Sequence, residues 1–154
     1  MSQETVFHKI VKGEAPCYKV WEDEDHLAFL TPFPNTEGFT VLIPKQYQPS
    51  YFAEVDDEPL FSLIKAAKKV ARVLEDGLDD VGRVGMIFEG FGVDYLHAKL
   101  VPMHGTADME EWREIKSDIN TYFERYPGYV SSHDSDKVSD DKLATLAEKI
   151  RVNA

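Results

Sequence analysis

Three side chains that can donate protons occupy alternate positions in the segment VDYLHAKLVPMHG, residues 93–105: Tyr95, His97 and Lys99. Alternate residues of a β-strand point to the same face, about 6.6 to 7 Å apart. A strand here would therefore place an imidazole between a phenol and an ammonium. Such a row could hold an anion, with His97 as the reacting group and Lys99 stabilising negative charge. The alternative is a half-exposed strand that carries ordinary polar residues.

The elements that must position this row are mainly strands. Leu96, Ala98 and Leu100 fill the intervening positions, which predicts a strand whose other face lies on a core. Gly90-Phe91-Gly92 predicts a tight hairpin turn into this strand. Four further strands are predicted from apolar or β-branched runs bounded by turn residues. They cover residues 18–22, the region around 27–29, and residues 39–44 and 82–89.

Helical spacing of apolar residues predicts the helices. The longest runs from Asp57, a candidate cap, to Leu78, with Pro59 in its first turn. A short helix is predicted over residues 4–12, and two more in the C-terminal third. These two contain Trp112 to Phe123 and the residues after Ser139. We therefore predict an α+β fold: a five-stranded, mainly antiparallel sheet, one long helix, a short N-terminal helix and a C-terminal helical extension.

The chain length suits one domain with a substantial core, since it has 154 residues, of which 43% are hydrophobic. We divide it into a domain over residues 1–105 and an extension over residues 106–154. That extension could cover the same domain, reach a partner subunit or form a lid over the site. The sequence does not choose among these three.

Composition excludes several classes of protein. No apolar run approaches the roughly 18 to 20 residues of a membrane span, and the polar N-terminus MSQET is not a signal peptide. The single Cys17 excludes an intrachain disulfide and suits a reducing compartment, so we expect a cytoplasmic protein. The net charge of −11 disfavours binding to nucleic-acid backbones. A small anionic ligand remains possible where a pocket is locally positive.

With these segments identified, the chain resembles the histidine triad (HIT) family of nucleotide hydrolases and transferases. The resemblance runs from about Val6 to about Gly105. It includes FHKIVKGEAP (residues 7–16), VWED followed by LAFL (20–23 and 27–30), PNTEG followed by TVLIPK (34–38 and 40–45), and VDYLHAKLVP (93–102). The resemblance implies a HIT-like fold and a homodimer whose sheets continue across a two-fold axis.

The family pattern has three histidines at alternate positions, and this sequence keeps the middle one. His97 matches the position that attacks the α-phosphorus of a nucleotide in the family. Tyr95 stands at the first position, and Lys99 stands at the third, where hydrolases carry histidine and transferases glutamine. Phe39 replaces a histidine usual after the loop glycine, and Thr31 replaces an acidic residue that usually meets the ribose.

The resemblance therefore implies a nucleotide-binding hydrolase acting on a purine nucleotide conjugate, of phosphoramidate or dinucleoside polyphosphate type, through a nucleotidyl-His97 intermediate. Lys99 would assist catalysis, and Tyr95, His104 and Asn35 are candidate substrate contacts. For Tyr95 simple packing is the competing interpretation. We expect no cofactor and no metal, since Asp94 points away from His97 and no dense ligand cluster exists.

The missing histidines keep two other functions open. One is a nucleotide-binding or scaffolding protein that has lost turnover, and the other is a nucleotidyl transferase.

Overall fold

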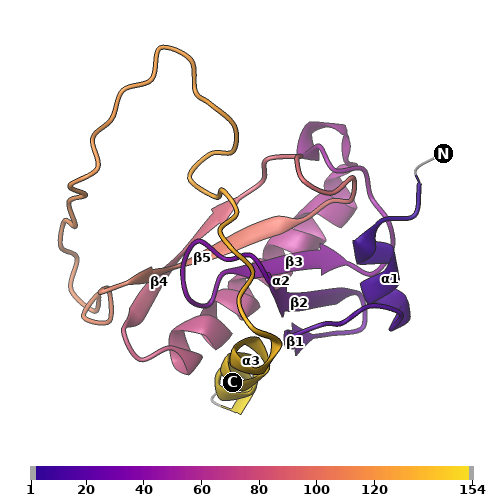
Figure 1. The fold of residues 1–154 in the computed structure, drawn as a ribbon, viewed down its shortest axis with the longest axis horizontal. Coiled ribbons are helices and arrows are strands. Elements are labelled where there is room, and N and C mark those ends of the chain that lie inside the picture. Colours follow the sequence, from indigo (N-terminus) through magenta and orange to yellow (C-terminus); the bar gives the residue numbers. More distant parts are fainter. Residues whose placement is uncertain (1–2, 153–154) are drawn as a thin grey trace.

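Five antiparallel strands form one sheet in the order β1-β2-β3-β5-β4. The computed structural model describes residues 3–152. Its elements are α1 (Val6–Lys12), β1 (Lys19–Glu22), β2 (His26–Leu30), β3 (Thr40–Pro44), the 3₁₀ turn η1 (Phe52–Glu54), α2 (Asp57–Gly77), β4 (Val81–Ile87), β5 (Ala98–His104) and α3 (Asp140–Val152). Figure 1 shows the sheet with α2 behind it.

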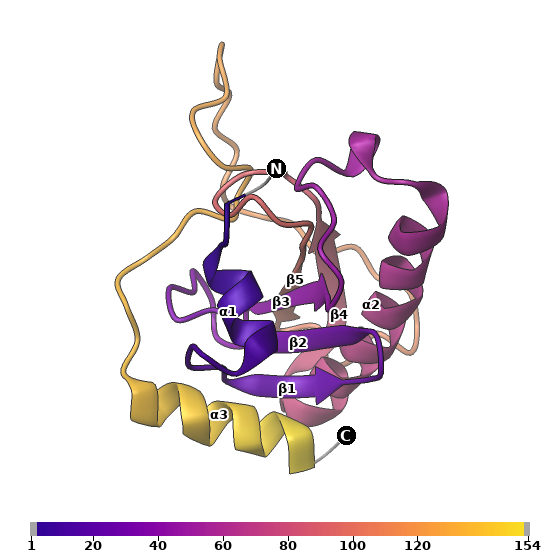
Figure 2. The ribbon, with the colours of Figure 1, turned by 90° about the vertical axis from the view of Figure 1, so that its right-hand side faces the viewer.

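Helices cover both faces of this sheet. In Figure 2, α1 lies on one face and α2 on the other, while α3 runs alongside the edge strand β1. The core is accordingly divided into two clusters. The larger contains the apolar faces of α2 and α3, and the smaller contains Phe7 and Ile10 of α1. Because β2 and β3 are covered on both faces, every residue in these two strands is buried.

The predicted two-faced segment around His97 is confirmed. Leu96, Ala98 and Leu100 belong to the cluster beneath α2, whereas Tyr95 belongs to the cluster beneath α1. The α+β class, the five-stranded antiparallel sheet and the long helix are confirmed as well. A smaller correction concerns the start of α2, where the capping position is Asp56 rather than Asp57.

The α1 helix is fixed at its first turn by a reciprocal cap. The Thr5 hydroxyl accepts a hydrogen bond from the His8 backbone N–H, and the His8 ring accepts one from the Thr5 backbone N–H at 2.9 Å. Such a capping box satisfies donors that the first helical turn leaves open. It also holds Phe7 against the ring of His97, with 5.3 Å between ring centroids.

The predicted tight turn between β4 and β5 is wrong. The ladder between these strands ends at the pair Ile87 and Lys99, so residues 88–97 form a longer connection. Gly90 and Gly92 do adopt positive φ angles of 76° and 88° within it. This longer connection leaves Glu89 and His97 outside the regular strands.

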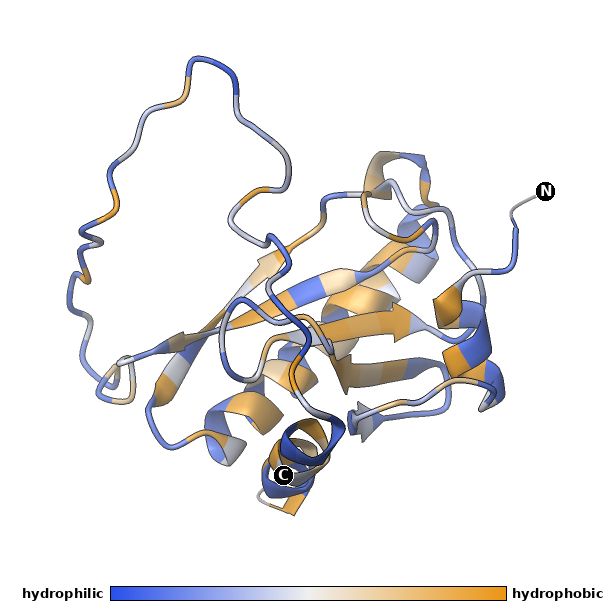
Figure 3. Cartoon of the chain, in the orientation of Figure 1, coloured by the Kyte–Doolittle hydropathy of each residue, from blue (hydrophilic) through white to orange (hydrophobic). Residues whose placement is uncertain are grey.

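The helix predicted over Trp112 to Phe123 is absent. Residues 107–139, which we call the 107–139 segment, contain no helix or strand and extend away from the sheet (Figure 1). Trp112, Ile119 and Tyr122 are 80%, 83% and 88% exposed. Figure 3 shows apolar and polar stretches alternating along this uncovered chain. An amphipathic helix is stabilised mainly by packing of its apolar face. Here the apolar side chains of the segment have no surface of the domain to pack against.

The final helix begins where the sequence predicted. The Ser139 hydroxyl accepts a hydrogen bond from the Lys142 backbone N–H at 3.3 Å, so Ser139 caps α3. Leu143, Ala147 and Ile150 join the larger core cluster. No helix within residues 3–152 has the length and apolar character needed to cross a membrane.

Candidate active site

A cavity of about 450 Å³ opens beside the start of β5. Its apolar wall is formed by Phe7 and Ile10 of α1 together with residues of β2 and β3. Its polar wall contains His97, Lys99 and Ser132. The volume lies within the range of small-molecule sites, and a mostly apolar lining with a few polar groups is typical of them.

One ring nitrogen of His97, Nε2, is available to react, because a hydrogen bond engages the other. Its Nδ1 lies 2.7 Å from the Tyr95 carbonyl oxygen. A carbonyl can only accept, so Nδ1 carries the proton and Nε2 carries a lone pair in the neutral ring. Within residues 3–152, Nε2 has no hydrogen-bond partner. The ring is held in place while its nucleophilic atom is uncommitted.

Burial keeps this imidazole neutral. The His97 residue is 5% exposed, and desolvation lowers its pKa below the ordinary value; the hydrogen bond to the Tyr95 carbonyl opposes this shift and the Lys99 charge adds to it. The neutral form is the one that can attack an electrophile. At neutral pH the site therefore holds a nucleophile without needing a general base to remove a proton from it.

Lys99 is fixed rather than free. Its ammonium lies 2.6 Å from Glu89 Oε1, donates to the Ser132 hydroxyl at 3.3 Å and sits 4.9 Å from the centre of the Tyr129 ring. The Lys99 side chain is 12% exposed and lines the cavity, whereas the Glu89 side chain is 2% exposed. The cation is thus anchored from behind by a carboxylate while it faces the cavity.

Tyr95, His104 and Asn35, which the sequence suggested as substrate contacts, do not line this cavity. Tyr95 is 1% exposed, and its hydroxyl donates to the carbonyl oxygens of Pro44 at 2.6 Å and Lys45 at 3.2 Å. Burial raises its pKa to about 12. The prediction that Tyr95 contacts substrate does not fit this position. Its backbone carbonyl, which orients His97, is what it contributes to the site.

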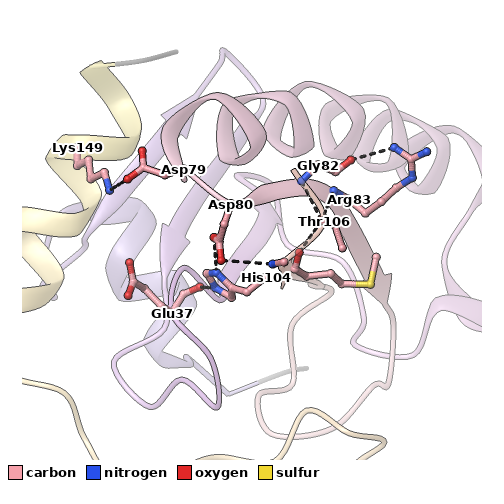
Figure 4. Close-up of polar contacts among 10 residues, drawn as sticks. Glu37, Asp79, Asp80, Gly82, Arg83, His104, Thr106 and Lys149 are labelled. Carbon is pink, nitrogen blue, oxygen red and sulfur yellow. Dashed lines mark hydrogen bonds and ion pairs between the residues drawn. The ribbon is translucent and has the colours of Figure 1, made fainter. Parts of the chain in front are cut away.

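His104 is the last residue of β5 and is not among the residues that line the cavity. Figure 4 shows its polar contacts. Its Nδ1 lies 2.8 Å from Asp80 Oδ1, and its Nε2 lies 2.8 Å from the Glu37 carbonyl oxygen. Both ring nitrogens are therefore engaged. The prediction that His104 contacts the substrate does not fit this position and is corrected here. Its bonds tie the end of β5 to the loop that precedes β3.

Asn35 lines a different cavity, of about 690 Å³, between the loop over residues 31–39 and α3. Its side-chain nitrogen donates to the Ser131 carbonyl at 2.9 Å, and its Oδ1 is buried without a partner. Asn35 thus helps to fasten the 107–139 segment instead of facing His97. Thr31 and Phe39, at the two positions that depart from the family pattern, line both cavities.

Sequence reasoning missed Glu89, Tyr129 and Ser132. Glu89 had a usable signal, because antiparallel pairing of the strands on either side of the turn brings it close to the His97 row. Tyr129 and Ser132 had none, since they reach the site through the irregular 107–139 segment. Within residues 3–152, no group of three histidine, cysteine, aspartate or glutamate side chains is arranged to hold a metal.

Comparison with known proteins identifies the family. The model of the HIT domain matches residues 12–106. The chain belongs to the HIT family. An uncharacterized HIT-like protein of Methanocaldococcus jannaschii is 34% identical over 117 residues, covering 73% of this chain and 89% of the relative. The adenosine 5′-monophosphoramidase hnt1 of Schizosaccharomyces pombe is 33% identical over 101 residues, covering 63% and 72%.

The solved HIT structures agree on the fold. A crystal structure of a HIT-like protein involved in cell-cycle regulation from Bartonella henselae matches with a TM-score of 0.68 at 25% identity, covering 97% of this chain and 95% of that one. The match to the HIT-domain model ends at Thr106, so that model does not include the 107–139 segment, which supplies Tyr129 and Ser132.

Proposed function

We propose that this HIT protein is a nucleotide hydrolase that acts on the α-phosphate of a purine nucleotide conjugate through a nucleotidyl-His97 intermediate. The observation that carries the proposal is the state of one ring: His97 donates through Nδ1 to the Tyr95 carbonyl and keeps Nε2 uncommitted beside a cavity. The name of the S. pombe relative, adenosine 5′-monophosphoramidase, supports a phosphoramidate as substrate.

The first step forms the intermediate. Nε2 of His97 attacks the α-phosphorus, and the bond from phosphorus to the leaving nitrogen breaks. Lys99, on the same side of the chain, donates a proton so that the leaving group departs as an amine. With a dinucleoside polyphosphate the leaving group is a phosphate chain, which can depart without that proton.

The second step releases the product. Water attacks the phosphorus of nucleotidyl-His97, and the bond between phosphorus and Nε2 breaks. With a phosphoramidate the proton of the water returns to the Lys99 amine, whereas with a dinucleoside polyphosphate Lys99 is still an ammonium and that proton passes to solvent. The products are a nucleoside monophosphate and the free amine, with the enzyme in its starting state. The Lys99 ammonium also stabilises charge that develops on the phosphoryl oxygens, which is worth about 10² to 10³ in rate at comparable sites.

The cavity suits a nucleoside attached to such a phosphate. Phe7, Ile10 and Phe29 give an apolar wall that a purine ring can contact, while His97 and Lys99 lie on the polar side. Thr31 supplies a hydroxyl there, in place of the carboxylate that the family usually directs at the ribose. The proposal therefore concerns the phosphate more than the sugar.

We also propose that the protein is a cytoplasmic homodimer without nucleic-acid or membrane partners. The β4 strand is an edge of the sheet, and Met86 on it is 44% exposed. Edges of this kind pair with a second chain unless they are blocked. Light scattering at micromolar concentration would report the mass, and a monomer would contradict the dimer.

Burial raises the pKa of Cys17 to about 11, which fits an unreactive thiol in a reducing compartment.

Rapid quench with adenosine 5′-phosphoramidate labelled at phosphorus tests the central proposal. We expect acid-labile label on the protein within one turnover, and none on the His97→Ala variant. A wild-type protein that releases AMP without ever carrying label would contradict the covalent intermediate.

One observation favours a second function, a binding protein without turnover. The Lys99 ammonium is already paired with Glu89, and the first and third motif histidines are replaced. Such a protein would bind AMP with unchanged affinity when His97 is replaced, and would release no amine. A nucleotidyl transferase would instead pass the label from His97 to an added phosphate acceptor faster than to water.

A further inference from the structure

Glu89 joins three parts of the chain at one carboxylate. It follows β4, and its Oε1 forms an ion pair with the ammonium of Lys99, a residue of β5. The returning end of the 107–139 segment supplies the other donors: the Ser132 hydroxyl contacts Oε1, and the Val130 backbone N–H donates to Oε2 at 2.8 Å. We call this set of contacts the Glu89 junction.

The junction differs from a surface salt bridge. The Glu89 side chain is 2% exposed, and a buried carboxylate is costly unless its oxygens are satisfied. Here burial opposes ionisation, but Lys99, Ser132 and the Val130 N–H together hold the pKa of Glu89 below its ordinary value. The carboxylate is therefore an ionised, fully engaged group behind the cavity wall.

The residues that Glu89 holds are the ones that line the cavity. Lys99 and Ser132 both contact Glu89 and both face the cavity, whereas Glu89 is not among its lining residues. Tyr129, next to Val130, lines the cavity too and lies against the Lys99 ammonium. One carboxylate thus orients a cation, a hydroxyl and an aromatic ring.

The geometry points to Glu89 as a positioning residue for Lys99, through which the 107–139 segment becomes one wall of the active site. This inference rests on the proposed function for its catalytic part. A cation whose place is fixed before substrate arrives stabilises developing charge better than one that must be ordered during the reaction. Without Glu89 the ammonium loses that fixed place, and residues 129–132 lose two of their bonds to the rest of the domain while keeping the one from Asn35 to the Ser131 carbonyl.

Amide hydrogen exchange tests the attachment without any substrate. In Glu89→Ala we expect exchange at the Val130 amide to accelerate at least about 10-fold, because its acceptor is gone. The Val138 amide, which donates to the Pro32 carbonyl at 2.9 Å, should keep its protection. Unchanged exchange at Val130 would overturn the inference. Equal acceleration at both amides would overturn it as well, since it would indicate general unfolding.

Turnover of adenosine 5′-phosphoramidate tests the positioning. Glu89→Gln keeps an acceptor for the Val130 amide but removes the charge that holds Lys99. We expect kcat to fall about 10- to 100-fold while KM does not rise, because the cavity becomes more positive toward a phosphate. Glu124→Gln, the same change on an exposed residue of the 107–139 segment, should leave both constants unchanged.

The outcomes separate the two proposals. Full kcat in Glu89→Gln together with retained Val130 protection would show that Glu89 has only a structural role, and would overturn the inference. A wild-type protein without turnover would end the proposed function, whereas the exchange experiment would still decide whether Glu89 holds residues 129–132.

Discussion

The two ends of β5 each carry a histidine, and the two rings are in opposite states. His97, just before the strand, has one ring nitrogen bonded to a carbonyl and the other uncommitted beside a cavity. His104, the last residue of the strand, has both nitrogens bonded, to Asp80 and to the Glu37 carbonyl. Reactivity requires that a ring be held and still keep a lone pair, and only the His97 end meets both conditions.

A third ring sharpens this comparison. His26 of β2 is 6% exposed, and its Nδ1 lies 3.0 Å from Asp23 while its Nε2 lies 3.1 Å from the Ser62 hydroxyl. This serine, histidine and aspartate lie in the order of a hydrolytic triad. Ser62, however, lies within α2, where the backbone N–H groups are used by the helix and cannot form an oxyanion hole. His26 therefore connects a turn to a helix, as His104 connects a strand to a loop.

Replacing His97 and His104 should show the largest difference between the two ends of β5. We expect His97→Ala to lower kcat for adenosine 5′-phosphoramidate by about 10⁴ to 10⁶, the loss typical when a nucleophile is removed. His104→Gln should stay within about threefold of wild type, since that side chain lies outside the cavity. Steady-state assays on both variants check this. A large activity loss in His104→Gln at full stability would contradict the assignment.

Lys99 should affect both rate and stability. We expect Lys99→Met to lower kcat by about 10² to 10³. It also leaves the Glu89 carboxylate buried without its cation, which costs roughly 3 to 5 kcal/mol when one partner of a buried pair is removed. Adding Glu89→Gln should recover most of the free energy of unfolding and none of the rate. Urea unfolding and turnover of the single and double variants measure the two effects separately.

At His26 the expected effect is on stability alone. Ser62→Ala removes the hydroxyl from the buried Nε2 of His26, and an unsatisfied buried polar atom costs about 1 to 3 kcal/mol. The free energy of unfolding should fall by that amount, while kcat stays unchanged. Serine-reactive fluorophosphonates should not label Ser62, because it lines neither cavity described above and has no oxyanion hole beside it. Labelling there would show that the serine, histidine and aspartate form a working triad.

The sequence predicted the sheet and α2 because their signals are local. Alternation around Leu96, Ala98 and Leu100, and helical spacing from Asp57 onward, both reflect burial that the structure contains. The helix over Trp112 to Phe123 failed for the opposite reason: its apolar stripe has nothing to pack against, and spacing alone does not stabilise a helix.

The site could be predicted only in part. His97, just before β5, and Lys99 within it occupy alternate positions of the chain, so their proximity follows from the backbone alone. Tyr95 occupies the preceding alternate position, but α1 covers it, and covering by another element cannot be read from alternation. Ser132 lies 33 positions after Lys99 in the sequence, with no periodic pattern to indicate the contact.

The smallest expected effect is the pH dependence of stability, in which His97 and His104 should act in opposite directions. Burial tends to lower the pKa of His104, but the Glu37 carbonyl and the Asp80 carboxylate raise it above the ordinary value. Its contribution to stability is therefore complete below about pH 6.5, the ordinary histidine pKa, and is lost as the pH rises through the higher folded value. Burial lowers the pKa of His97, so the unfolded chain binds its proton more readily. The contribution of His97 is complete above about pH 6.5 and is lost as the pH falls through the lower folded value.

Thermal unfolding between pH 5 and pH 9 separates the two contributions. His104→Gln should remove a decline of the melting temperature above neutrality of no more than about 2 °C, because the pair of His104 and Asp80 is partly exposed and screened. His97→Gln should remove a decline on the acid side and leave the alkaline side unchanged. If both variants flattened the same side of the profile, the opposite states inferred for the two rings would be wrong, and with them the reason for assigning the chemistry to His97.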